Sequence, residues 1–398
     1  MLRHVKLYCG LLVVVYLTLA LGYVIHSNLV TPNGYSIFSD FTVFWAAAHM
    51  AATGHAADAY STGPLQHLVL TLVPGLENNT NPDFGWFYPP SFYLLLLPIG
   101  FLSYTPFAYG AFILPTLGAY ALVVQRICHD DRTLWVLSAF SAVWVNLYRG
   151  QNGFLTAALA GASLLALDNK RPWLSGVLLG LLSIKPHLFM LFPLILLTTG
   201  QWKTVGAAAL TAGCLMTTGL IVLGPDTLSA WMDSTRLARH LVENPPIIDR
   251  YWPAMPTLFA QCRLLGISTE TSYAIHLTVA SIASLSVLFI WRRHPDPALR
   301  NSALVTGSLL ISPYLMPYDL TWLALPIAWM YRAGTRTGWH VGERTLLFLM
   351  WIIPLPSPAI ARLISLQVVP FLLLGLLGLI LKRTLTAQNP ALSPKIPQ

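Results

Sequence analysis

The sequence predicts an all-α polytopic membrane protein that forms a single integral-membrane domain over residues 1–398. Hydrophobic residues make up 55% of the chain and charged residues only 10%, whereas a soluble globular domain carries about 25% charged residues. Apolar runs recur from end to end, and many approach the roughly 17–25 residues that a membrane-crossing helix needs. These runs do not alternate apolar and polar residues, which favours helices over a barrel.

The first apolar segment, residues 7–24, follows Arg3 and Lys6 and lacks a small-residue cleavage site. It therefore predicts a retained signal-anchor helix. With the later segments we expect about 12 transmembrane helices. Two long polar connections, residues 26–86 and 224–255, are expected outside, with short re-entrant or interfacial helices in such loops. The later apolar segments cover residues 88–104, 106–124, 133–147, 153–167, 173–184, 187–199, 204–223, 271–291, 298–311, 320–330, 345–360 and 363–381.

The formal charge of +8 marks topology here and does not indicate a nucleic-acid partner. Basic residues fall in short clusters between apolar segments, as they do in cytoplasmic loops. This pattern predicts a multi-pass protein of the plasma (inner) membrane with both termini in the cytoplasm. The number of segments is odd, however. Either residues 88–104 form a re-entrant or interfacial piece, or the charge rule fails at the loop that holds Arg126 and Arg132.

The segments 173–184 and 187–199 are too short to cross a bilayer. A dozen helical residues extend ~18 Å, against ~30 Å of hydrocarbon. Their junction, which contains Lys185 and His187, is therefore expected at the base of a cavity that opens outward. The four cysteines are scattered and form no metal-ligand or disulfide pattern, so we expect no metal site.

Asp40 is the leading candidate for a catalytic residue. It follows the first apolar segment and is surrounded by aromatic residues, where an ionised carboxylate is costly unless it is used. A helix N-cap formed by Ser39 or Asp40 is an equally good local explanation.

Further candidates for substrate binding lie at breaks between apolar segments. Each also has a plain structural explanation, as a capped turn, a proline-fixed entry or a snorkelling lysine. Arg149 could clamp a phosphate with its planar guanidinium group. The candidates are Tyr88, Arg149, Gln151, Asn152, Lys185, His187, Tyr314, Tyr318 and Asp319. Gly176 and Gly180 are interpreted as a helix-packing pair.

The order and spacing of these motifs resemble glycosyltransferase family 87, whose members are GT-C-type membrane enzymes and include polyprenyl-phosphate-mannose-dependent mannosyltransferases. The matching motifs are Asp40-Phe41, Trp45 with Gly54, Tyr88-Pro89-Pro90, Gly150-Gln151-Asn152, Lys185-Pro186, and Ser312-Pro313 with Tyr318-Asp319. Where the family tends to have Asn-Gln-Ser-Leu, this chain has Ala254-Met255-Pro256-Thr257-Leu258.

The resemblance implies a GT-C-like fold and the transfer of a mannose-like hexose from a polyprenyl-phosphate donor. The acceptor would be a hydroxyl of a lipid-linked or envelope glycan on the extracytoplasmic face. It also implies inversion at the anomeric carbon without a metal or other cofactor. Asp40 would be the general base, and Lys185 and Arg149 would stabilise the leaving phosphate. The alternatives are a transporter or flippase of a lipid-linked sugar, and a non-catalytic envelope-assembly scaffold.

Overall fold

The computed structural model describes residues 4–27, 38–73, 85–245, 251–293 and 296–388, and every regular element within these ranges is a helix. Parts of the two long connections, residues 28–37, 74–84 and 246–250, lie outside the described residues. The prediction of an all-α protein is confirmed for the described chain.

Five helices of the described chain are long and apolar enough to cross a membrane. They are α1 (Val5–Ser27), α5 (Pro106–Cys128), α12 (Trp202–Leu223), α16 (Thr269–Arg293) and α21 (Val368–Gln388). A sixth span is possible if α19 (Glu343–Ile352) and α20 (Ser357–Ile364), which meet at 89°, count as one. The described residues thus give five or six spans by length and composition, and the expected number of about 12 is not confirmed.

The shortfall arises because many apolar segments form short helices. The segment 88–104 becomes α4 (Pro90–Gly100), whose 11 residues extend only ~16 Å. The segment 133–147 divides into α6 (Thr133–Ser138) and α7 (Ser141–Arg149). The other helices are α2 (Ser39–Ala52), α3 (Thr62–Leu72), α8 (Gly153–Asp168), α9 (Pro172–Leu181), α10 (Pro186–Phe189), α11 (Leu191–Thr198), α13 (Asp226–Glu243), α15 (Leu258–Leu264), α17 (Pro297–Ile311) and α18 (Ala324–Thr337), with the 3₁₀ helices η2 (Asp58–Tyr60), η3 (Leu182–Ile184), η4 (Trp252–Ala254) and η5 (Pro317–Leu323).

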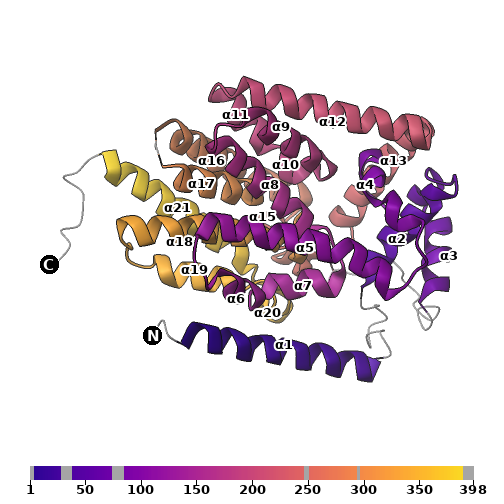
Figure 1. The fold of residues 1–398 in the computed structure, drawn as a ribbon, viewed down its shortest axis with the longest axis horizontal. Coiled ribbons are helices and arrows are strands. Elements are labelled where there is room, and N and C mark those ends of the chain that lie inside the picture. The colour runs from indigo at the N-terminus through magenta and orange to yellow at the C-terminus, as the bar shows by residue number, and fades with distance from the viewer. Residues whose placement is uncertain (1–3, 28–37, 74–84, 246–250, 294–295, 389–398) are drawn as a thin grey trace.

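The two long polar connections are largely helical where they are described. The first contains α2, η2 and α3, and the second contains α13. Trp231 of α13 donates a hydrogen bond from its indole Nε1 to the carbonyl of Phe87 at 3.2 Å. Figure 1 shows α2, α3, α4 and α13 gathered at one end of the molecule, while α1 lies along one edge.

Close helix packing explains two glycines of α9. A Cβ atom on Gly176 would lie 2.4 Å from the carbonyl oxygen of Thr204, and one on Gly180 would lie 2.5 Å from the Cβ of Thr211. Both neighbours belong to α12. The interpretation of Gly176 and Gly180 as a packing pair is therefore confirmed.

Candidate active site

Asp40 lies in the first turn of α2, two residues after a residue with a strained backbone. The N-cap is Phe38, which has a left-handed backbone (φ 65°), and no side chain caps the helix. The capping explanation for Ser39 and Asp40 therefore does not hold. The Phe38 conformation, which is costly for a residue with a Cβ, is held by a hydrogen bond from its amide to the carbonyl of Tyr148 at 3.0 Å.

The turn from Arg149 to Gly153 lies so close to α2 and η5 that its two glycines leave no room for a side chain. Gly150 has a φ of +68°, and a Cβ there would lie 2.5 Å from the Cβ of Phe41. A Cβ on Gly153 would lie 2.5 Å from the carbonyl oxygen of Tyr318. The two glycines thus bring the amide side chains between them against the helix that carries Asp40.

Asn146 of α7 fixes the shape of this turn. Its Nδ2 donates to the carbonyl of Gln151 at 3.0 Å, and its Oδ1 accepts from the amide of Gly153 at 3.1 Å. Asn146 is fully buried. We did not predict this residue, although a polar side chain at the end of an apolar segment just before a glycine-bounded turn was a usable signal.

Gln151 connects Tyr88 to Asp40. Its Oε1 accepts from the hydroxyl of Tyr88 at 3.1 Å and from the amide of Asn152 at 3.0 Å. The Gln151 side chain also lies close enough to Asp40 to lower the pKa of its carboxyl group. Because its oxygen already has two donors, the amide Nε2 is the group available to that carboxylate. Three residues that are distant in sequence therefore meet at one point.

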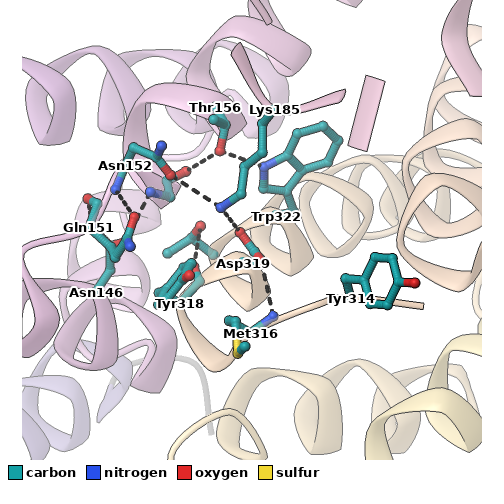
Figure 2. A network of polar contacts seen from close by, with 12 residues as sticks. Asn146, Gln151, Asn152, Thr156, Lys185, Tyr314, Met316, Tyr318, Asp319 and Trp322 are labelled. Carbon is teal, nitrogen blue, oxygen red and sulfur yellow. Dashed lines mark hydrogen bonds and ion pairs between the residues drawn. The ribbon is translucent and has the colours of Figure 1, made fainter. Parts of the chain in front are cut away.

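Lys185 and Asp319 form an ion pair beside this turn (Figure 2). Their side chains are only 4% and 1% exposed. Lys185 Nζ also donates to Asn152 Oδ1 at 3.2 Å and lies 4.7 Å from the centre of the Tyr318 ring. The second oxygen of Asp319 accepts from the amide of Met316 at 3.0 Å. The charge of Lys185 is therefore matched within the protein.

Arg149 differs from Lys185 in having no ion pair to a carboxylate of the described chain. It is half-buried, and its Nη1 donates to Ser39 Oγ at 3.4 Å. Burial raises the pKa of Asp40, while the charges of Arg149 and Lys185 and the hydrogen bonds from Gln151 and Ser39 lower it, and the balance is a raised pKa. A carboxylate and a half-buried guanidinium group thus share one partly desolvated site.

Two polar atoms in the site have no hydrogen-bond partner among the described residues. They are Asn152 Nδ2 and His187 Nε2, and both are buried. A buried donor or acceptor without a partner is costly, so these atoms are candidate contacts for a ligand.

The structure brings together all but one of the residues predicted for the site. The group consists of Asp40, Tyr88, Arg149, Gln151, Asn152, Lys185, His187, Tyr318 and Asp319. Tyr314 is the exception, because its hydroxyl lies 2.5 Å from the hydroxyl of Tyr273, and Figure 2 shows it apart from the network. Among the described residues, no group of three or more His, Cys, Asp or Glu side chains could hold a metal ion. The expectation of a metal-independent enzyme stays a prediction.

Comparison with protein families matches residues 86–313 to glycosyltransferase family 87. Comparison with curated proteins and with solved structures found no match. The matched region covers more than half of the 398 residues and contains the Arg149–Gly153 turn and Lys185, whereas Asp40 precedes it and Asp319 follows it. With this matched region and several helices long and apolar enough to cross a membrane, the chain belongs to glycosyltransferase family 87.

Proposed function

We propose that this membrane glycosyltransferase moves a mannose-like hexose from a polyprenyl-phosphate donor to a hydroxyl group of a lipid-linked or envelope glycan. The reaction takes place on the extracytoplasmic face of the plasma membrane and inverts the anomeric carbon. The observation that carries the proposal is the convergence of Asp40 and Arg149, one base and one cation, at the start of α2.

Asp40 is the general base of this reaction. The acceptor hydroxyl must lose its proton as its oxygen attacks an anomeric carbon with oxocarbenium character. The carboxylate of Asp40 takes that proton, and the new bond forms on the face opposite the breaking bond to the phosphate oxygen. Because burial raises the pKa of Asp40, its carboxylate is a stronger base than that of an exposed aspartate, and the charge of Arg149 favours its ionised form.

Arg149 stabilises the leaving lipid phosphate. The electron pair of the broken bond remains on the phosphate oxygen, so negative charge grows there in the transition state and a preorganised cation is most useful. Arg149 fits this role better than Lys185, because Lys185 already pairs with Asp319. We therefore assign phosphate binding to Arg149, with Lys185 holding Asn152 in place.

The unpartnered atoms Asn152 Nδ2 and His187 Nε2 suit the sugar hydroxyls. A hydroxyl group can both donate and accept, so it can satisfy the amide of Asn152 and either tautomer of His187. Loss of such a contact leaves a buried polar group unpaired, which gives discrimination between sugars that differ at one hydroxyl.

The test is a transfer assay with purified protein in lipid nanodiscs. A synthetic polyprenyl-phosphate mannose carrying labelled sugar is the donor, and an alkyl mannoside is the acceptor probe. We expect labelled disaccharide whose new linkage has the anomeric configuration opposite to that of the donor. Absence of transfer, together with protein-dependent movement of the donor across vesicle membranes, would instead identify a transporter.

A further inference from the structure

A cavity whose lining contains none of the residues grouped around Asp40 lies where three pairs of consecutive helices come together. Its lining comes from the end of α8 and the start of α9, from the turn between α11 and α12, and from the end of α16 and the start of α17. The cavity has a volume of about 390 Å³, within the range of small-molecule sites. Its lining includes Asp168, Lys170, Gln201, Trp291 and Arg300. The glycosyltransferase chemistry uses none of these residues.

The position of the cavity indicates a ligand at the surface of the bilayer. Two of the long apolar helices have a terminus beside it, because α12 begins at Trp202 and α16 ends at Arg293. Trp173 and Trp202 are each next to a lining residue in sequence and are 62% and 67% exposed. Exposed tryptophans at helix ends are typical of the headgroup level of a membrane. Figure 1 shows these helices together in one part of the molecule.

The charges in the cavity have both signs. Lys170 is exposed, and its left-handed backbone (φ 58°) ends the turn after α8. The guanidinium group of Arg300 lies 5.4 Å from the centre of the Trp291 ring, and its Nε is buried with no partner among the described residues. Asp168 accepts a hydrogen bond from Asn301 Nδ2 to its Oδ2 at 2.7 Å, and its other oxygen accepts none from the residues that the structure describes.

We propose that this cavity binds the headgroup of a membrane phospholipid that carries both a phosphate diester and a primary ammonium group, as phosphatidylethanolamine does. Lys170 and Arg300 hold the phosphate, and the free oxygen of Asp168 accepts from the ammonium group. A lipid without the cation would leave Asp168 facing a phosphate. A quaternary ammonium group would reach the cavity but could donate no hydrogen bond to the carboxylate.

The test measures lipid retention by native mass spectrometry, with the full chain purified in detergent and titrated with phosphatidylethanolamine, phosphatidylcholine or phosphatidylglycerol of matched acyl chains. We expect the apparent Kd for phosphatidylethanolamine to be about tenfold below the other two, because one charge-assisted hydrogen bond is gained. Equal retention of the three lipids by the wild-type protein, or tightest retention of phosphatidylglycerol, would by itself overturn the proposal.

Two variants locate the site. Asp168→Asn keeps the shape of the side chain and should reduce the preference for phosphatidylethanolamine over phosphatidylcholine about tenfold. Arg300→Gln should weaken retention of all three lipids. The matched control is Arg293→Gln. Arg293 is an exposed residue at the end of α16 that does not line the cavity, so the retention of all three lipids should stay unchanged. An unchanged preference in folded Asp168→Asn protein would refute the assignment.

Discussion

Lys185 and Asp319 form an ion pair in the interior of the protein, although 134 residues separate them in the chain. The pair joins the break before α10 to η5, and through Asn152 it also reaches the turn beside Asp40. Because both charges are buried, each depends on the other to offset the loss of its hydration. The pair therefore positions the site and supports the fold.

Replacing one partner should destabilise the protein strongly. For Lys185→Met and for Asp319→Asn we expect losses of ~3–5 kcal/mol in unfolding free energy, because a buried charge is left alone. The double variant Lys185→Met/Asp319→Leu should recover part of this loss. Thermal unfolding of the purified variants in detergent measures the effect. Single variants as stable as the wild type would show that the ion pair does not contribute to the stability of the protein.

The same variants distinguish pairing from phosphate binding. If Lys185 positions Asn152, then Lys185→Met should lower turnover while a donor analogue still binds to folded protein at low temperature. A loss of donor binding in Lys185→Met, with binding retained in Asp319→Asn, would assign the phosphate to Lys185.

Asp40→Asn should lower turnover by ~10²-fold or more, since general-base assistance contributes ~10²–10⁴-fold. The substitution keeps the shape and one acceptor oxygen of the side chain but removes its basicity. Donor binding and the melting temperature should change little. Asp58→Asn is the control, because Asp58 is an exposed acid of the same connection that pairs with His55. Turnover near the wild-type value in Asp40→Asn would exclude Asp40 as the base.

Arg149→Gln should change both donor binding and the pH profile. Loss of a charge-assisted phosphate contact of ~1.5–3 kcal/mol predicts a donor KM about 10–100 times higher. Arg149 is also the strongest influence that lowers the pKa of Asp40, so its removal should raise that pKa further. The base works only when deprotonated, so activity should be lost at a higher pH as the solution is acidified.

The control for Arg149→Gln is Arg236→Gln, an exposed arginine of α13 that pairs with Asp233. Arg236→Gln should leave both the donor KM and the pH profile of activity unchanged. Arg149→Lys should restore the charge effect on the pH profile more fully than it restores donor binding, because an ammonium group lacks the planar fork. A donor KM and an acid limb that both match the wild type in Arg149→Gln would place the phosphate elsewhere.

Gly153→Ala should destabilise the site, because its Cβ would lie 2.5 Å from the carbonyl oxygen of Tyr318 and 2.6 Å from Asn146 Oδ1. Backbone must move to admit the methyl group, so we expect lower activity and a lower melting temperature. Gly213→Ala is the control, since a Cβ there meets nothing within 4 Å and lies within α12. It should keep or raise the melting temperature, because alanine favours a helix by about 1 kcal/mol over glycine.

Local patterns in the sequence predicted the helical class, and they singled out residues that the structure brings together around Asp40. Breaks with Gly, Pro and a polar side chain singled out Arg149–Gly153 and Lys185, because such residues rarely occur between apolar helices without a purpose. Their roles in the reaction stay predictions. Pairings across the chain could not be predicted, since nothing near Lys185 in sequence indicates Asp319. For the same reason, the contact between Tyr314 and Tyr273, which lies 41 residues away, could not be predicted. The expected number of about 12 spans is not confirmed, because hydropathy alone does not distinguish a crossing helix from a short one such as α4.

The sidedness of the membrane insertion is the last prediction, and the proposed donor depends on it. Basic clusters put the end of α18 in the cytoplasm and the end of α13 outside. Asn244 and Thr335 are exposed residues at these two ends. Single cysteines at the two positions, in a chain without its four natural cysteines, can be probed with an impermeant maleimide in cells whose outer envelope is permeable.

We expect Asn244→Cys to be labelled in intact cells and Thr335→Cys only after lysis. The arrangement matters because α13 is joined to the Asp40 site through the hydrogen bond from Trp231 to Phe87, the residue before Tyr88, so Asn244 reports the side on which Asp40 lies. Lipid-linked sugars serve as donors where nucleotide sugars are absent. Labelling of Thr335→Cys but not Asn244→Cys would put Asp40 on the cytoplasmic side, and the choice of a polyprenyl-phosphate donor would lose its main physical reason.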